Sequence, residues 1–239
     1  MSLSPSIQVD RKLWVLRNFD LFKSLRDEDL EELIRASRIV SFGRNDHICM
    51  SGVQHTHAYL IKEGNVRIVH SHVTGKRLTL GILKPGELIG DVDLFNHELP
   101  LGESAEAIGE VQLYAVPIDL LQRTIMKNPD VTLKMSRLAG DRRSEVVNLI
   151  QDVLFLTVPQ RLAKLLCRLA KEFPGTTKNG RLFVNLKLTH AELADLIGAN
   201  REAVSATLGK WKQQGIVENI KGFFVIKDLS RLNDLSLTQ

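Results

Sequence analysis

The clearest pattern of apolar and polar positions lies near the C-terminus, between Leu188 and Lys227. Thr189 and Glu192 are spaced as a Thr-x-x-Glu capping box, in which the hydroxyl and the carboxylate each satisfy a free backbone amide where a helix begins. Apolar residues follow at helical spacing. Gly198 can end the run because glycine accepts a left-handed backbone without steric cost. The pattern predicts one helix from Thr189 to Gly198.

A second helix is predicted directly after the first. Asn200 is a favourable N-cap, and Val204, Leu208 and Trp211 fall on one face at spacings of i, i+4 and i+7. Gly215 closes this helix in the same way that Gly198 closes the first. The turn between the two helices is therefore short, and one face of the second helix remains polar.

Two alternating runs, 216–220 and 223–227, come next, around the two-residue hairpin signal Lys221-Gly222. Two helices with a tight turn and a following hairpin are typical of a winged helix-turn-helix, whose second helix meets base edges in a DNA groove. Plain core packing is the alternative for such a helix pair, and the capping box, glycine turn and hairpin together favour the DNA reader. The predicted DNA contacts are Thr189, Asn200, Arg201, Glu202, Ser205, Ala206, Lys212 and Lys221.

The first half of the chain has a different pattern. Residues 13–37 are predicted to form a short pair of helices, with an acidic first turn at 27–29. From Ile39 onward, short β-type runs are separated by glycines at 43, 52, 64, 75 and 86, and the last run is 111–116. Regularly spaced short strands with turn signals predict an antiparallel sandwich or small barrel.

The chain is predicted to be helical again after Ile118, with a break at Asn128-Pro129 and a long helix to about Thr157. Thr157 is predicted to cap a further helix over 161–173, followed by a loop at 174–180 and a strand at 181–186. Apolar positions of the long helix follow the alternating spacing of a coiled-coil seam, which predicts a homodimer; burial of this stripe against the β-domain is the alternative. The seam consists of Met135, Ala139, Arg142, Val146, Leu149, Val153 and Leu156.

These elements predict an α+β fold with an N-terminal antiparallel β-domain, a long dimerisation helix and a C-terminal winged helix-turn-helix. The expected domains are 1–128, 129–157 and 158–239.

Composition and charge narrow the class of protein. The 239 residues are 44% hydrophobic and 25% charged, and no apolar run reaches the roughly 18 residues that a membrane span needs. The first residues carry no basic segment followed by an apolar one, so we expect a cytoplasmic protein without membrane contact. Residues 155–239 hold 13 Lys and Arg against 7 Asp and Glu, whereas residues 1–154 hold 19 against 21. The positive charge therefore accompanies the predicted DNA reader, as phosphate contacts require.

In this order, the β-domain, the seam-bearing helix and the winged helix-turn-helix resemble the CRP/FNR family of bacterial transcription regulators. The resemblance extends from about Leu16 to Asp228. Its most specific parts are Pro85-Gly86-Glu87 through Asp91-Val92-Asp93-Leu94-Phe95, similar to the family's ligand-loop segment, and Thr189 through Trp211. The resemblance implies a homodimer joined along the long helix, an effector sensed in a β-roll domain, double-stranded DNA bound by two paired readers, and RNA polymerase as a partner.

The departures from the family pattern concern the effector. Family members that bind cyclic AMP carry an Arg-Ser pair in the ligand loop, where this chain has Glu103-Ser104, and a carboxylate there would repel the cyclic phosphate. Val146 and Val147 replace long-helix residues that would hydrogen-bond the adenine. We therefore predict an effector other than cyclic AMP, with a cyclic-AMP-responsive regulator of altered pocket as the alternative. The predicted pocket residues are Gly90, Asp91, Glu103, Ser104, Arg142, Val146 and Val147.

Other chemistry is only weakly indicated, and the sequence identifies no cofactor. The His-x-His pairs His55/His57 and His70/His72 could each offer two imidazoles to a metal or haem, which keeps a haem-, metal- or redox-sensing regulator open as the alternative, although histidines near turns are more often simply solvated. Cys49 and Cys167 lie among apolar residues, as small core residues do. The sequence contains no catalytic motif, which argues against an enzyme. A protein-binding adaptor is the other alternative, but it would not explain the Arg201-Glu202 pair, whose side chains are suited to contact base edges.

Overall fold

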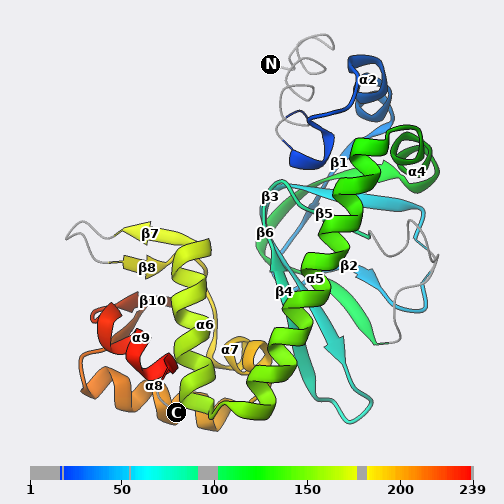
Figure 1. The fold of residues 1–239 in the computed structure, drawn as a ribbon. Helices are drawn as coiled ribbons and strands as arrows, with labels where there is room; N and C mark the ends of the chain where they lie inside the picture. The colour runs from blue at the N-terminus through cyan, green and yellow to red at the C-terminus, as the bar shows by residue number, and fades with distance from the viewer. Residues whose placement is uncertain (1–16, 18, 54, 91–101, 177–181, 238–239) are drawn as a thin grey trace. The chain divides into compact units, whose positions relative to one another are not determined.

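The computed structural model describes residues 17, 19–53, 55–90, 102–176 and 182–237. The chain divides into two compact units, of which the first comprises Met1–His72 and Gly81–Ser144 and the second Val73–Leu80 and Glu145–Gln239 (Figure 1). The long helix, predicted as a segment of its own, contributes to both units, because the division falls between Ser144 and Glu145.

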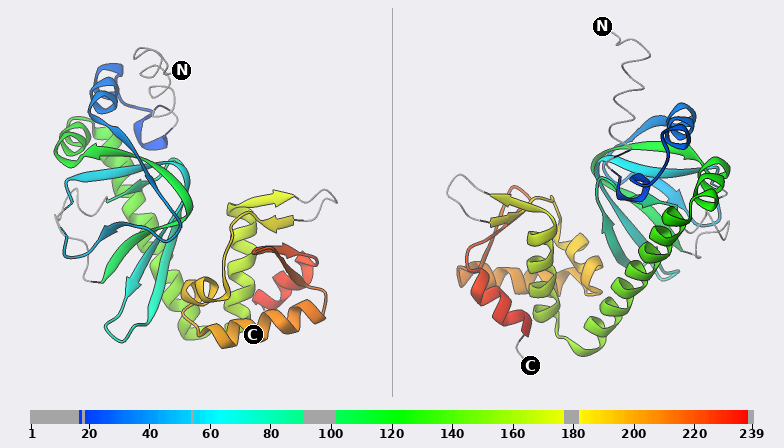
Figure 2. Two further views of the ribbon diagram at one scale, coloured as in Figure 1. Left: turned by 180° about the vertical axis from the view of Figure 1, so that it is seen from behind. Right: turned by 45° about the horizontal axis from the view of Figure 1, so that its top comes forward.

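The first unit is built on an antiparallel β-sheet with helices at its ends. Its strand order is β1-β6-β3-β4, with β2 on β6 and β5 on β3. Figure 2 shows α2 and α4 side by side at one end of the sheet. The elements from the N-terminus to the long helix are η1 (Asp20–Phe22), α2 (Asp27–Ala36), β1 (Arg38–Phe42), β2 (His47–Met50), β3 (His57–Ser71), β4 (Arg77–Leu83), β5 (Leu88–Ile89), β6 (Glu103–Pro117), α4 (Ile118–Lys127) and α5 (Pro129–Phe155).

Strands β3 and β6 are much longer than the sequence pattern predicted. They pair antiparallel from His57 opposite Pro117 to His70 opposite Glu103, with register shifts on both sides of Glu63. The prediction that Gly64 separates two strands is wrong, because this glycine lies inside β3. Gly64 has φ +86°, and a Cβ there would lie 2.4 Å from the Glu110 carbonyl oxygen. Glycine thus permits an irregularity inside one continuous strand.

Two apolar clusters stabilise this unit. One lies between the helices and the sheet and includes Phe22, Leu30 and Leu121. The other lies within the sheet domain and includes Ile61, Leu113 and the buried Cys49. The core position of Cys49 agrees with its prediction as a small apolar residue, since its exposed fraction is 2%.

The first part of the predicted dimer seam is also buried in this core. Met135 is only 6% exposed and belongs to the cluster that contains Leu30 and Leu121. A residue buried within its own protomer cannot contact a partner, so the prediction that Met135 is part of the dimer seam is wrong. The alternative weighed from the sequence, in which the stripe packs against the β-domain, holds for this end of α5.

The second unit contains the predicted helix pair and hairpin. Its sheet has the order β7-β8-β10-β9. Residues 174–176 form a short strand where a loop was predicted, and a C-terminal helix follows the hairpin. After α5 the elements are α6 (Val158–Glu172), β7 (Pro174–Thr176), β8 (Leu182–Val184), α7 (His190–Ile197), α8 (Arg201–Gln213), β9 (Val217–Ile220), β10 (Phe223–Ile226) and α9 (Leu229–Leu237).

Helix α6 forms the centre of this unit. It begins with a capping box between Thr157 and Gln160, so the predicted cap at Thr157 is confirmed. Its buried face includes Leu162 and Leu166, both at 0% exposure, and it packs on α7, α8 and α9. The helix pair is thereby attached to α6, and the hairpin joins the unit through β8, which pairs with β10, and through contacts of β9 with α8.

Candidate nucleic-acid interface

Helix α7 begins and ends as its sequence predicts. The Thr189 hydroxyl accepts a hydrogen bond from the Glu192 amide at 3.2 Å, and the Glu192 carboxylate accepts one from the Thr189 amide at 2.6 Å. Gly198 adopts the left-handed conformation, with φ 59° and ψ 46°. Three residues further on, α8 can therefore begin at Arg201 in a new direction.

A side chain that the sequence did not single out holds the end of α7. The Arg161 guanidinium, from α6, donates to the carbonyl oxygens of Ile197 at 2.6 Å and Gly198 at 3.3 Å. A cation at a helix C-terminus is favoured by the helix dipole as well as by these hydrogen bonds. Burial lowers the pKa of Arg161, and the nearby Asp152 carboxylate opposes that shift. Arg161 thus fixes α7 on α6.

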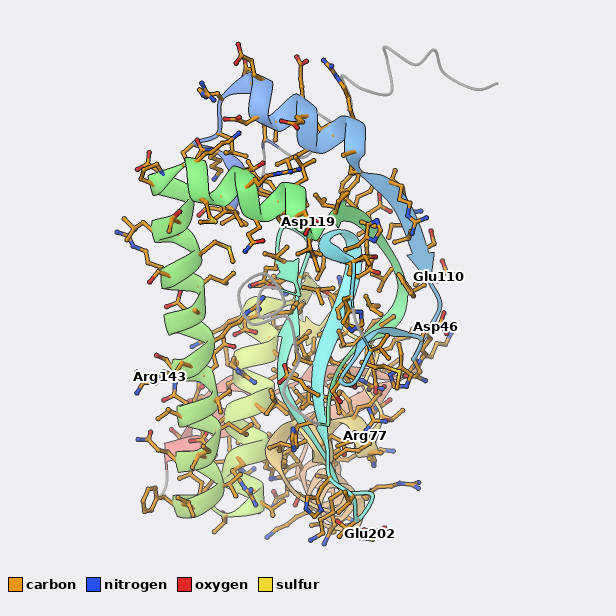
Figure 3. All side chains as sticks on the ribbon, turned by 90° about the vertical axis from the view of Figure 1, so that its right-hand side faces the viewer. Asp46, Arg77, Glu110, Asp119, Arg143 and Glu202 are labelled. Atoms are coloured by element: carbon orange, nitrogen blue, oxygen red, sulfur yellow. The ribbon has the colours of Figure 1, made fainter. Side chains whose placement is uncertain are left out.

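Helix α8 separates a buried face from an open one. The Asn200 side chain accepts from the Ala203 amide at 2.8 Å, which confirms the predicted N-cap. Val204, Leu208 and Trp211 are buried at 0%, 7% and 2% exposure. The exposed residues of the opposite face include Arg201, Glu202 and Ala206, and Glu202 can be seen on α8 in Figure 3. The first two turns of α8 therefore offer a cation, a carboxylate and a small side chain to an outside partner.

His190 connects three parts of this surface. Its Nδ1 is hydrogen-bonded to the Ser205 Oγ of α8 at 2.9 Å. Its ring lies 6.3 Å from the Phe224 ring of β10, centroid to centroid, with a tilt of 36°. Ser205 itself is half-buried. No motif in the sequence singles out His190, although it is the first residue after the capping threonine and lies where α7 faces its neighbours.

The hairpin places positive charge at its turn. Ile220 pairs with Phe223, which leaves Lys221 and Gly222 as a two-residue turn with φ values of 53° and 90°. Positive φ at both positions defines the type I′ turn of β-hairpins, so the predicted wing is confirmed as a hairpin. Lys221 is exposed, as is Lys212 in the last turn of α8. Lys227, in contrast, is paired with Glu218 at 2.7 Å.

Two family models match different parts of the chain. The cyclic nucleotide-binding domain matches residues 39–128, and the Crp-like helix-turn-helix domain matches residues 160–235. A CRP-like cAMP-activated global transcriptional regulator from Mycobacterium tuberculosis is 29% identical over 91% of this chain and 96% of its own length. The chain belongs to the CRP/FNR family of transcription regulators.

Further CRP/FNR relatives cover most of the same chain. The anaerobic regulatory protein of Bacillus subtilis is 24% identical over 81% of this chain and 81% of its own. The crystal structure of a CRP/FNR transcriptional regulator from Thermus thermophilus is 27% identical, covers 84% of this chain and 99% of its own, and has a TM-score of 0.69. These comparisons identify a DNA-binding transcription regulator rather than an enzyme.

In this CRP/FNR regulator, the predicted effector residues within the described part of the first unit lie at strand ends and on α5. Gly90 is buried and has φ 85°, Glu103 is half-buried, and Ser104 is 8% exposed. The Arg142 guanidinium donates to the Leu88 carbonyl oxygen at 2.6 Å. Asp91 lies outside the described residues. Val146 and Val147 belong to the second unit, and the pocket as a whole stays a prediction.

Near Ser104 the structure contains a buried ion pair that was not predicted from the sequence. Arg67 of β3 and Glu106 of β6 lie directly opposite each other, 2.9 Å apart from Nε to Oε2, and are 6% and 2% exposed. The Asn45 side chain accepts from the same guanidinium at 3.1 Å, and the Ser104 hydroxyl lies 3.5 Å from the other carboxylate oxygen. The serine that would face a cyclic phosphate is thus directed at a carboxylate.

The second half of α5 carries an exposed apolar row. Val147, Ile150 and Leu154 are 43%, 52% and 69% exposed and share one face at spacings of i, i+3 and i+7. Arg143 lies on the same face, and Figure 3 shows it pointing away from the sheet of its own unit. Of the predicted seam residues on this half of the helix, Val153 is 41% exposed whereas Leu149 is half-buried, so the open face overlaps the predicted seam only in part.

The other predicted candidates remain separate from one another. The His55 imidazole bonds the Met50 backbone, with 2.9 Å from Nε2 to the carbonyl oxygen. Burial lowers the pKa of His57, and the Arg38 charge lowers it further. In the part of the chain that the structure describes, no three His, Cys, Asp or Glu side chains gather as a metal site. No helix among the described residues is long and apolar enough to cross a membrane.

Proposed function

We propose that this CRP/FNR regulator is a homodimer that reads an inverted-repeat DNA site under the control of an effector other than cyclic AMP. The observation that supports this proposal best is the open face of α8, where Arg201 and Glu202 stand exposed at the N-terminal end of a capped helix. Arginine suits the two acceptors of guanine, and glutamate accepts from the amino group of cytosine. Lys212 and Lys221 would contact phosphates on either side.

The dimer part of the proposal rests on α5. A row of three apolar side chains that are 43–69% exposed would leave a hydrophobic strip in water in a monomer. Two copies of the helix, packed along Val147, Ile150 and Leu154, would bury that strip as a coiled-coil seam does. Two paired readers would then occupy successive major grooves with half-site centres about 34 Å apart. RNA polymerase as a further partner, and the cytoplasm as the location, follow from the resemblance to bacterial regulators.

One experiment tests assembly and DNA reading together. Binding-site selection from random DNA should yield an inverted repeat, and sedimentation at micromolar concentration should show a dimer. Replacing Ile150 by Glu would place a charge in the seam and should yield monomers with much weaker site binding. The control Asn148→Glu adds the same charge on an exposed position away from the row and should remain dimeric. A monomeric wild-type protein, or a selection without any enriched motif, would contradict the proposal.

The effector part of the proposal rests on charge. Glu103 stands where cyclic-AMP-binding members place the phosphate-binding arginine, and the adjacent Ser104 is directed at the Glu106 carboxylate. Neither group attracts a phosphate. The Mycobacterium tuberculosis relative is described as cAMP-activated, so the effector can be tested directly against it.

Calorimetry with cyclic AMP provides this test. The wild-type protein should show no binding at micromolar ligand, whereas Glu103→Arg restores the Arg-Ser pair and should bind more tightly than wild type. Glu110→Arg, a change at an exposed position of the same strand, is the matched control for charge alone. Micromolar affinity of the wild-type protein would overturn this part of the proposal and leave DNA reading intact.

A further inference from the structure

His190 is fixed from two sides at the start of α7. The Nδ1–Oγ distance to Ser205 is 2.9 Å, and the ring lies against Phe224, which is 1% exposed and therefore buried in the core. The imidazole is half-buried and belongs to the first helical residue after the Thr189 cap. Its position is thus determined by α7 and β10, while its hydrogen bond reaches the reading helix.

Ser205 differs from other hydroxyl residues on the helices of this protein. The Thr207, Thr124 and Ser144 hydroxyls each donate to the backbone carbonyl four residues earlier, at 2.8–3.0 Å. This local bond is the usual one for Ser and Thr inside a helix. Within the described residues, the Ser205 hydroxyl instead bonds the imidazole of another helix. Ser205 is also three residues after Glu202 and four after Arg201, so it lies on the same side of α8.

A serine hydroxyl has one proton and two acceptor lone pairs, and a neutral imidazole has one donor and one acceptor nitrogen. When Nδ1 is the acceptor, the Ser205 hydroxyl donates its hydrogen bond to His190. The oxygen then offers only lone pairs to the DNA groove. In the major groove, such an acceptor matches the adenine N6 or cytosine N4 amino group and does not match the guanine or thymine acceptors.

We propose that His190 is a positioning residue that sets the base preference of Ser205: its Nδ1 accepts the hydrogen bond of the Ser205 hydroxyl, which leaves the serine oxygen as an acceptor for an adenine or cytosine amino group. The inference rests on the proposed DNA-reading function of α8. According to this inference, His190 of α7 helps to determine the base sequence that α8 recognises, although His190 itself does not contact the bases.

The test is binding-site selection with a small set of variants. His190→Phe keeps the ring against Phe224 and removes the acceptor, and His190→Asn keeps an acceptor close to the place of Nδ1. Wild type should prefer adenine or cytosine at one position of each half-site. His190→Phe should lower that preference about three- to tenfold, the size of one neutral hydrogen bond, and His190→Asn should restore most of it. Affinity for random DNA should stay within about twofold, because no phosphate contact is changed.

A double-variant comparison separates this role from packing. If His190 acts through Ser205, adding His190→Phe to Ser205→Ala should cause no further loss of base preference. Thermal melting by circular dichroism identifies any variant that fails to fold, and His190→Leu then replaces His190→Phe as the acceptor-free variant. An unchanged preference in a folded acceptor-free variant, or additive losses in the double variant, would overturn the inference. A wild-type protein that selects no motif would instead refute the proposed function.

Discussion

The two units of this regulator differ in whether their polar and charged side chains are buried in pairs or exposed to solvent. In the first unit, Arg67 and Glu106 are turned inward and satisfy each other at 2.9 Å with almost no exposure. In the second unit, Thr189, Asn200 and Arg161 satisfy the ends of helices, and Arg201 and Glu202 remain open to solvent. The buried Arg67–Glu106 pair could bind a ligand only if the two side chains first separated. Capped helix ends, by contrast, hold a surface rigid and leave its reading side chains free for a partner.

Breaking the buried pair should have the largest effect. Glu106→Ala leaves the Arg67 charge buried without its carboxylate, which should lower the free energy of unfolding of the first unit by about 3–5 kcal/mol. Each unit carries one buried cysteine, Cys49 in the first and Cys167 in the second, so thiol labelling across a urea series reports on each separately. Burial raises the pKa of the Cys167 thiol, which slows its labelling further in the folded state.

In the Glu106→Ala variant, Cys49 should become reactive at much lower urea, with little change at Cys167. Glu110→Ala removes an exposed carboxylate from the same strand and should change stability by less than about 0.5 kcal/mol. Equal urea midpoints for Cys49 in these two variants would show that the buried pair does not stabilise the sheet.

The open face of α8 should give the next largest effect. Glu202→Ala should reduce discrimination at one base pair of each half-site by about 1–3 kcal/mol, because a base-edge contact is lost. Glu202→Gln retains hydrogen-bonding capacity without the charge. It therefore separates base reading from favourable interaction of the carboxylate with the N-terminal dipole of α8. Selection of identical motifs by wild type and Glu202→Ala would mean that Glu202 reads no base.

Removing the Arg161 contact at the end of α7 tests whether capped helix ends stabilise the DNA-binding unit. Arg161→Met removes the guanidinium that holds the last carbonyls of α7 and should cost about 1–2 kcal/mol of unfolding free energy in the second unit. Urea unfolding followed at Cys167 measures this cost. Arg168→Met, at an exposed position of the same helix, is the control and should stay near wild type. A loss as large in the control would assign the effect to α6 rather than to the end of α7.

The smallest expected effect concerns phosphate contacts. Lys212→Ala should weaken binding to all sequences alike and lower the slope of log affinity against log salt by about 1 per half-site. Lys227 is already paired with Glu218 at 2.7 Å, so Lys227→Ala should change the slope less. Titrations of one specific and one random duplex at several salt concentrations would measure both slopes. A loss confined to the specific duplex would contradict a phosphate role for Lys212.

The sequence was sufficient where the signal for a structure is local. Each helix end is determined by residues within one helical turn of each other. The positions of these residues therefore predicted the two helices and the turn between them: Thr189 with Glu192, Gly198, and Asn200 with Ala203. The wing was predictable for the same reason, because the Lys221-Gly222 turn signal and the two strands that it joins are adjacent in the sequence.

Features that depend on pairing between distant segments were not predictable. Arg67 and Glu106 lie 39 residues apart and meet only because β3 and β6 pair in one register. Gly64 was taken as a turn because alternation looks the same for one bent strand as for two short ones. The face of α5 was also ambiguous, since apolar residues occur on two sides: Met135 in the core and Ile150 in solvent.

Lys221 has a consequence for engineering. It is one of two non-glycine residues with positive φ among those described, and this backbone costs a lysine on the order of 1 kcal/mol, whereas asparagine adopts it readily. Replacing Lys221 with Asn should therefore make the protein more heat-resistant and at the same time remove a charge from the wing tip. A screen for thermostable variants that measures only folding would therefore select Lys221→Asn, although this variant should bind DNA more weakly. At position 221, selection for thermal stability and selection for DNA binding therefore favour different amino acids.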